Sequence, residues 1–75
     1  MQVEIKELPE QRVATVSHVG PYDKLAETHA VIDAWMDANK YAPAGAPWEV
    51  YVTDPGETPN PADWRTDVFY PVKPR

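Results

Sequence analysis

Hydrophobic and polar residues alternate in two stretches at the start of the chain, and this period of two predicts strands. In residues 2–7, Val3 and Ile5 fall on one face, with charged residues between them. Residues 11–19 are rich in β-branched residues, which favour strands. Pro9 lies between the two stretches and cannot donate to a ladder. The pattern therefore indicates either one strand bent at Pro9 or two separate strands.

The pattern then changes to a helical period. Gly20-Pro21 ends the preceding strand, and proline suits the first turn of a helix. The apolar residues that follow recur at helical spacing, so residues 22–39 are predicted to form a helix with one face on the sheet. Its apolar stripe is Leu25, Ile32, Trp35 and Met36. Residues 40–47, which include two prolines, are predicted to be a loop.

Two further strands are predicted after the helix, at residues 48–53 and 66–72. The connection between them, about a dozen residues long and rich in proline, would make a wide hairpin, and loops of this length are often functional. The predicted fold class is therefore α+β: an antiparallel sheet with one long helix on one face. The residues expected to face the helix from these two strands are Val50, Val52, Val68 and Tyr70.

Two acids and two aromatic rings would then share the opposite, uncovered face of the sheet: Glu49, Tyr51, Asp67 and Phe69. Such a face indicates a ligand groove or a subunit interface. Asp67 beside the ring of Phe69 has the chemistry to hold a cationic aromatic ligand. The plain alternative, which the strand by itself favours, is a solvated aspartate. Candidates for the rim of the groove are Trp48, Trp64 and Tyr22. Packing of the long loop is the favoured explanation for the two tryptophans, and Tyr22 can equally cap the helix.

Length and composition limit the class of protein. A chain of 75 residues forms one domain with a thin core. It contains no cysteine, so disulfides and thiolate metal ligands are excluded. His18 and His29 have no partner at metal-binding spacing, and we expect neither a metal nor a cofactor. Oligomerisation is then the remaining common way to bury more surface.

Charge and hydropathy exclude several partners. The net charge of −5 argues against binding DNA or RNA, which basic patches drive. No apolar run approaches the ~18 residues that a membrane span needs. The N-terminal residues alternate charged and apolar side chains, unlike a signal peptide. We therefore expect a cytoplasmic protein.

Five segments, in order along nearly the whole chain, resemble the GyrI-like small-molecule-binding family, which includes effector-binding domains of multidrug-sensing and AraC-type regulators and gyrase-inhibitory proteins. The segments are residues 4–14, His18-Val19-Gly20-Pro21-Tyr22, residues 43–47, residues 50–55 and Arg65-Thr66-Asp67-Val68-Phe69-Tyr70-Pro71-Val72. The resemblance implies a strand–helix–strand–strand module. Family domains usually hold two such modules about a pseudo-twofold, with the ligand in a concave groove between them. Residues 1–75 supply one module without a DNA-binding segment, which implies a homodimer that binds small amphipathic aromatic molecules, cationic ones included. The alternative is a monomer that pairs with a second, different module.

The resemblance also bears on catalysis. The family motif usually has Glu where this chain has Asp67, an acid that contacts ligand in the sensors and resembles a catalytic residue, assisted by a Tyr, in hydrolytic members. The candidate pair here is Asp67 with Tyr51. Aspartate places its carboxylate about 1.5 Å short of glutamate's position, which weakens the case for proton transfer more than for binding. The favoured function is non-catalytic ligand binding. The alternatives are a small hydrolase of reactive hydrophobic electrophiles and a protein-binding module like the gyrase inhibitors.

Overall fold

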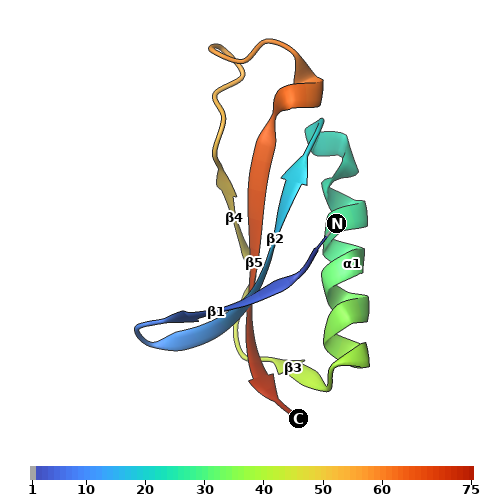
Figure 1. Cartoon of the computed structure of the whole chain (residues 1–75), viewed down its shortest axis with the longest axis vertical. Helices are drawn as coiled ribbons and strands as arrows, with labels where there is room; N and C mark the ends of the chain where they lie inside the picture. Colours follow the sequence, from blue (N-terminus) through green and yellow to red (C-terminus); the bar gives the residue numbers. More distant parts are fainter. Residues whose placement is uncertain (1) are drawn as a thin grey trace.

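The computed structural model describes residues 2–75 and shows an α+β fold, with one helix beside a five-stranded antiparallel sheet (Figure 1). The predicted fold class is confirmed. The strands are β1 (Glu4–Leu8), β2 (Gln11–Val19), β3 (Tyr41–Pro43), β4 (Trp48–Tyr51) and β5 (Arg65–Pro74), and the helix is α1 (Leu25–Ala38). The sheet order is β1-β2-β5-β3, and β4 also pairs with β5. None of the helices in residues 2–75 is long and apolar enough to span a membrane.

The first two predicted stretches are separate strands. β1 and β2 form an antiparallel hairpin in which Glu4 lies opposite Thr15 and Leu8 opposite Gln11. Pro9 falls in the turn between them, where its missing N–H costs no ladder hydrogen bond. The hairpin projects to one side of the molecule, away from the helix (Figure 1).

The helix begins with a 3-10 turn, Tyr22–Lys24, which runs directly into α1. The prediction of a helix over residues 22–39 is therefore confirmed. Pro21 precedes the turn as its N-cap residue. Lys40 ends the segment in a left-handed conformation with φ 61°, which turns the chain back toward the sheet.

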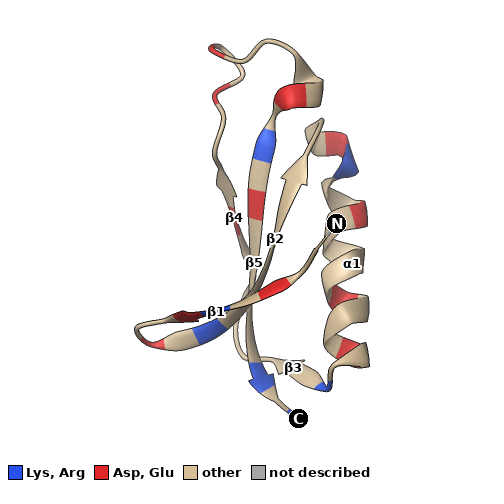
Figure 2. Cartoon of the chain, viewed as in Figure 1, with Lys and Arg blue, Asp and Glu red and all other residues tan. Residues whose placement is uncertain are grey.

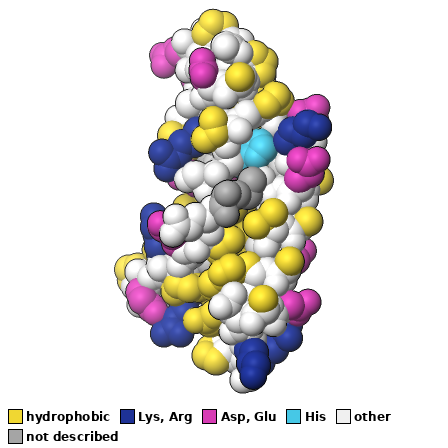
Figure 3. Space-filling view, turned by 45° about the vertical axis from the view of Figure 1, so that its right-hand side comes forward, with side chains coloured by type: hydrophobic (Ala, Val, Ile, Leu, Met, Phe, Trp, Pro, Cys, Tyr) yellow, Lys and Arg dark blue, Asp and Glu magenta, His cyan; other side chains and the backbone are white. Residues whose placement is uncertain are grey.

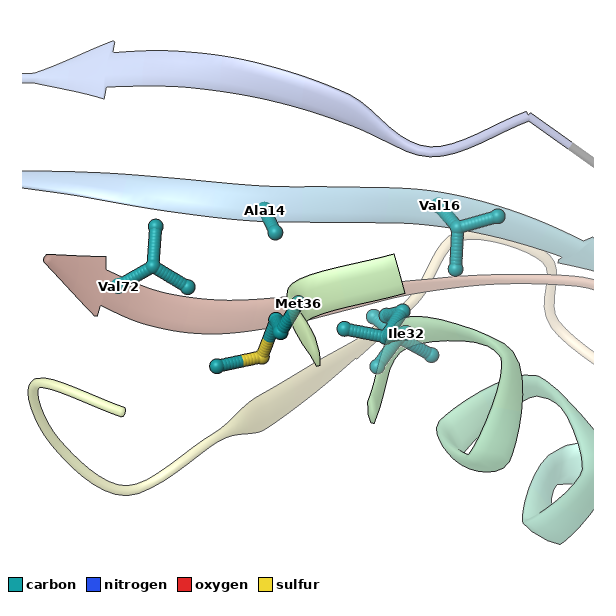
Figure 4. Close-up of a cluster of buried hydrophobic side chains, with 6 residues drawn as sticks. Ala14, Val16, Ile32, Met36 and Val72 are labelled. Atoms are coloured by element: carbon teal, nitrogen blue, oxygen red, sulfur yellow. The ribbon is translucent and has the colours of Figure 1, made fainter. Parts of the chain in front are cut away.

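The core lies between α1 and the strands β2 and β5, as Figure 4 shows from the side. Ile32 and Met36 are buried from the helix, as predicted, while Leu25 and Trp35 are partly buried beside them. The buried cluster consists of Ala14, Val16, Ile32, Met36, Val68 and Val72. Hydrophobic side chains also gather on the lower part of the surface in Figure 3, as expected for a domain too small to enclose all of them.

The prediction of a loop over residues 40–47 is wrong at its start. Tyr41–Pro43 forms the short strand β3, which pairs with the end of β5. A strand of only three residues, one of them a proline, is too short to show a recognisable alternation of apolar and polar side chains. The strand is fixed by tertiary contact, because the ring of Tyr41 stacks on Trp35 of α1 with centroids 5.4 Å apart.

β5 is the central strand of the sheet and sets the two faces on which any site must lie. It pairs with β2 along one side and with β3 and β4 along the other. Thr66, Val68 and Val72 are buried on the side of the helix. Because side chains alternate along a strand, Asp67 and Phe69 belong to the opposite face. Figure 2 shows the charged positions of β5 near its two ends, and acidic positions along α1.

Candidate functional site

The predicted site residues do not share one face, because the prediction placed β4 in the wrong phase. Glu49 lies opposite Val68 and Tyr51 opposite Thr66, so both side chains are on the side of the helix. Trp48 and Val50 lie with Phe69 and Asp67 on the face of the sheet away from the helix, called the far face below. The apolar alternation of Trp48, Val50 and Val52 suggested a core-facing set, but β4 is an edge strand that the helix does not cover with its apolar stripe.

The helix-side residues form a hydrogen-bonded cluster around the carboxylate of Glu49. One carboxylate oxygen, Oε2, lies 2.7 Å from Nε2 of His29 on α1. The other, Oε1, accepts a hydrogen bond of 2.8 Å from the hydroxyl of Tyr51. The second ring nitrogen of His29, Nδ1, lies 2.5 Å from the hydroxyl of Tyr70 on β5. Two strands and the helix therefore hold one carboxylate in place.

One assignment of protons that satisfies this cluster has a neutral imidazole at His29. If Tyr70 donates to Nδ1 of His29, then Nε2 carries the ring proton and donates to Glu49. Tyr51 donates to the other oxygen of the same carboxylate. With the imidazole neutral, the cluster keeps the one negative charge of Glu49.

The electrostatics of the cluster favour an ionised Glu49. The hydrogen bond from His29, and next that from Tyr51, lower the pKa of the Glu49 carboxyl below its usual value and outweigh its partial burial. The hydrogen bond to Glu49 raises the pKa of Tyr51, so this phenol stays protonated as a donor. Burial, followed by the charges of Asp33 and Glu49, raises the pKa of Tyr70.

Aromatic rings extend the cluster toward the long loop. The ring of Tyr22, in the 3-10 turn before α1, meets Tyr51 edge-on with centroids 5.3 Å apart. The opposite neighbour of Tyr22 is Trp64, at 4.7 Å. Trp64 is tied to the loop by its indole N–H, which donates to the carbonyl of Thr58 at 2.6 Å. Three of the predicted residues therefore form a continuous row of rings that leads to Glu49.

The turn that carries Tyr22 is itself held by a buried histidine. His18 on β2 places Nε2 2.9 Å from the carbonyl of Pro21, which requires that this nitrogen carry the proton. Its Nδ1 lies 2.8 Å from the hydroxyl of Thr28 on α1. The backbone N–H of Gly20, a residue with φ 136°, donates to the carbonyl of Trp64 at 2.8 Å. These bonds fix the start of the helix relative to β2 and β5.

Sequence reasoning missed two members of the cluster, His29 and Tyr70. Alternation along the strand predicts that Tyr70 faces the core, and His29 enters the sequence argument as a helix residue without a partner at metal-binding spacing. Their separation from Glu49 along the chain hides the contact, although His29 stands beside the apolar stripe of the predicted helix. Within residues 2–75, the structure brings together no group of three or more His, Asp or Glu side chains that could hold a metal ion.

Asp67 lies in a different environment on the far face. Its carboxylate accepts hydrogen bonds from Arg65, at 3.0 and 3.3 Å, and from the hydroxyl of Ser17, at 2.8 Å. Burial, the largest influence, raises the pKa of Asp67, but these bonds and the charges of Arg65 and Lys6 outweigh it and leave the pKa below its usual value. Its negative charge is already paired within the chain.

A polar hollow of about 400 Å³ adjoins Asp67, and its lining includes Lys6, Thr15, Ser17 and Arg65. The predicted aromatic neighbours are not part of this lining. Phe69 instead stacks on Trp48 with centroids 5.2 Å apart and an angle of 13° between the rings. The far face thus offers a mixed-charge hollow and a separate aromatic pair, whereas the helix side combines a carboxylate with rings.

Comparison with known proteins identifies the family. Residues 1–73 match the family model of the GyrI-like small molecule binding domain, so the chain belongs to this family and the suspected resemblance is confirmed. Membership supports a role in binding a small ligand. Searches of curated proteins and of solved structures gave no match.

Proposed function

We propose that the protein binds small hydrophobic or aromatic molecules, cationic ones included, beside Glu49 on the helix side of β4. The carrying observation is the carboxylate of Glu49, fixed by His29 and Tyr51 and followed by the rings of Tyr51, Tyr22 and Trp64. The side chain of Glu49 is 25% exposed, and Tyr51 as a whole residue is 57% exposed. A ligand can therefore reach both the acid and the neighbouring ring.

This arrangement suits an aromatic cation better than an anion. A positive group next to Glu49 would meet a carboxylate that stays ionised at neutral pH. The flat part of the same ligand would lie against Tyr51 or Tyr22, where a cation near a ring gains about 0.5–2 kcal/mol. Asp67 is a weaker anchor, because a ligand would have to compete with Arg65 for its carboxylate.

We further propose that two copies of the chain share the ligand site beside Glu49. The thin core of a 75-residue chain without disulfides gains from a partner. The exposed ring of Tyr51 and the exposed valines Val50 and Val52 lie together at the β4 edge of the sheet, where a second copy would cover them. The twofold dimer is the commonest closed assembly of a single chain.

The alternative function as a hydrolase is not supported for the pair Asp67 and Tyr51, but the pair Glu49 and Tyr51 has a suitable arrangement. Asp67 and Tyr51 lie on opposite faces of the sheet, so these two residues do not form a catalytic pair. Glu49 and Tyr51 are joined by a hydrogen bond of 2.8 Å, with His29 on the other carboxylate oxygen. In such a hydrolase Glu49 would activate water, and the protonated Tyr51 would donate to the developing oxyanion. Turnover of a reactive electrophile by the wild type, lost in Glu49→Gln, would establish this function.

The location of the ligand is tested with tryptophan fluorescence. A cationic rhodamine-type dye is titrated into two variants, Trp48→Phe and Trp64→Phe. Trp64 is in the row of rings beside Glu49, whereas Trp48 is on the far face with Phe69. We expect dye to quench the Trp48→Phe protein, which keeps Trp64, more strongly than the Trp64→Phe protein. Stronger quenching of the protein that keeps Trp48 would place the ligand on the far face and overturn the proposal.

A further inference from the structure

Within residues 2–75, β4 is an edge strand with one side left unpaired. It pairs with β5 in the register Trp48 opposite Phe69 through Tyr51 opposite Thr66. Val50 is 45% exposed and Val52, just after the strand, is 50% exposed. An edge that is both open and apolar is a site at which another strand can pair.

The direction of each backbone group along β4 follows from its bonds to β5. The N–H of Val52 donates to the carbonyl of Arg65 at 3.0 Å, so this residue directs its hydrogen-bonding groups toward β5. Groups alternate along an antiparallel strand, so those of Val50 and Trp48 also point toward β5. The N–H and C=O groups of Glu49 and Tyr51 therefore point outward, toward the open edge.

Only certain registers let two such edges pair antiparallel about a twofold axis. The outward-facing residues Glu49 and Tyr51 must form the hydrogen-bonded pairs. An axis at Val50 meets this condition, because Glu49 of each copy then faces Tyr51 of the other copy. Each of these two pairs exchanges both backbone hydrogen bonds. Axes at Glu49 or at Tyr51 also satisfy the backbone, but the first places two carboxylates directly opposite each other, which is unfavourable.

The side chains agree with the axis at Val50. On the far face, Val50 meets its own copy, and Trp48 of each chain lies opposite Val52 of the other. Aromatic and β-branched residues are favourable partners across strands. On the helix side, the carboxylate of Glu49 lies opposite a phenol rather than another acid. The sequence Trp48-Glu49-Val50-Tyr51-Val52 is thus complementary to itself.

We propose that two copies of the chain pair along β4, antiparallel about a twofold axis at Val50, so that each Glu49 receives Tyr51 of the second copy. This inference rests on the proposed ligand site shared by two copies and specifies how that site is built. Directly opposed residues share a face, so the α1 helices of both copies lie on the same side of one continuous sheet. Between them, the two Glu49 residues are diagonal neighbours about 7–8 Å apart at their backbones. One cationic ligand can then interact with both carboxylates.

The register is tested by single cysteines, since the chain has none of its own. In the Val50→Cys variant, two Cα atoms at a non-hydrogen-bonded pair lie about 4.5 Å apart, within the range that a disulfide spans. The matched control is Val52→Cys, which has similar exposure on the same face. Its two Cα atoms are offset by four residues, at least about 13 Å apart, which is too far for a disulfide.

We expect mild oxidation to produce about tenfold more covalent dimer from Val50→Cys than from Val52→Cys, measured by gel electrophoresis without reductant. Equal yields, or a higher yield from Val52→Cys, would overturn the register. Sedimentation equilibrium of the cysteine-free protein gives an independent answer, because the monomer mass is 8.5 kDa. A mass of 8.5 kDa at all micromolar concentrations overturns the pairing, and about twice that value supports it.

The two proposals can fail separately. Dye affinity of the cysteine-free protein and of Glu49→Gln reports on the ligand site without reference to the cross-link. If the protein stays monomeric and its dye binding depends on Glu49, the proposed β4 pairing is wrong and the proposed ligand site is supported. A cross-linked Val50→Cys dimer that binds no dye would keep the pairing and remove the proposed function.

Discussion

Nε2 of His29 lies 2.7 Å from Oε2 of Glu49, and this bond joins α1 to the edge strand β4. The same carboxylate is the centre of the proposed ligand site. We therefore expect it to have two measurable effects, one on the stability of the fold and one on the affinity for a cation, which pH and mutation can separate.

The first prediction concerns stability against pH. In the folded chain, the hydrogen bonds from His29 and Tyr51 hold the pKa of Glu49 below its ordinary value of 4.5. Its contribution to stability is therefore present above about pH 4.5 and is lost as the pH falls through the lower folded value. Urea unfolding between pH 7 and pH 3 should show a smaller loss of stability for Glu49→Gln than for the wild type.

Asp67 shows the same direction of shift, so its carboxylate contributes a part of the acid sensitivity that Glu49→Gln retains. The variant Asp67→Asn should remove that part of the acid sensitivity. The double variant should remove the contributions of both carboxylates. Stability curves of wild type and Glu49→Gln that run parallel through the acid range would contradict the assignment to Glu49.

The second prediction concerns affinity for a cationic dye at neutral pH. Replacing Glu49 by Gln should weaken binding about five- to thirty-fold, which corresponds to about 1–2 kcal/mol for a cation near an acid and a ring. The matched control is Asp67→Asn, which should change affinity less than about twofold because Arg65 already pairs with that carboxylate. A larger loss of affinity from Asp67→Asn than from Glu49→Gln would mean that Asp67, and not Glu49, binds the cation. Fluorescence titration at constant ionic strength measures both.

The third prediction uses one substitution at two buried threonines. The hydroxyl of Thr28 bonds to Nδ1 of His18, so Thr28→Val leaves a buried nitrogen unpaired and should cost about 1–3 kcal/mol. Among the residues that the structure describes, the hydroxyl of Thr66 is buried without a hydrogen-bond partner. Thr66→Val should therefore be neutral or stabilising. Urea unfolding of both variants gives the comparison, and an equal loss from both would show that the Thr66 hydroxyl is also satisfied.

The fourth prediction locates the core with neighbouring helix residues. Ile32 is 0% exposed between α1 and the sheet, whereas Val31 is 37% exposed. Ile32→Ala should lower the free energy of unfolding by about 2–5 kcal/mol, because the cavity is lined by residues that cannot all relax. Val31→Ala should change it by less than about 0.5 kcal/mol, as expected away from the core. Similar losses from the two variants would mean that the helix is rotated from the described position.

Local pattern was sufficient for the helix and for the identity of four strands. The Gly20-Pro21 break and the spacing of Ile32 and Met36 are local signals, and both features lie where the sequence placed them. β3 was missed because its position depends on pairing with β5 and on the stack of Tyr41 on Trp35, which join distant parts of the chain.

The sequence named only some members of the candidate site, Glu49, Tyr51, Tyr22 and Trp64, and it missed His29 and Tyr70. Alternation shows that Glu49 and Tyr51 share a face, yet it cannot show which face when the strand is at the edge of the sheet. The apolar residues of β4 lie on the face of the sheet away from the helix. The usual expectation that apolar residues face the core therefore fails for this strand. The sequence pattern does not predict that His29 bonds to Glu49, because their contact depends on how α1 crosses the sheet.

The two edges of the sheet differ in charge, and this difference bears on aggregation. β1 carries the exposed charges of Glu4, Lys6 and Glu7, and Pro9 follows it in the turn. An edge of this kind resists pairing with foreign strands. Growth of an open-ended fibre needs two receptive edges on every copy, and the part of the chain that the structure describes offers one at β4, four residues long. The proposed association through β4 would therefore end when that edge is filled, and the exposed valines would not lead to polymerisation.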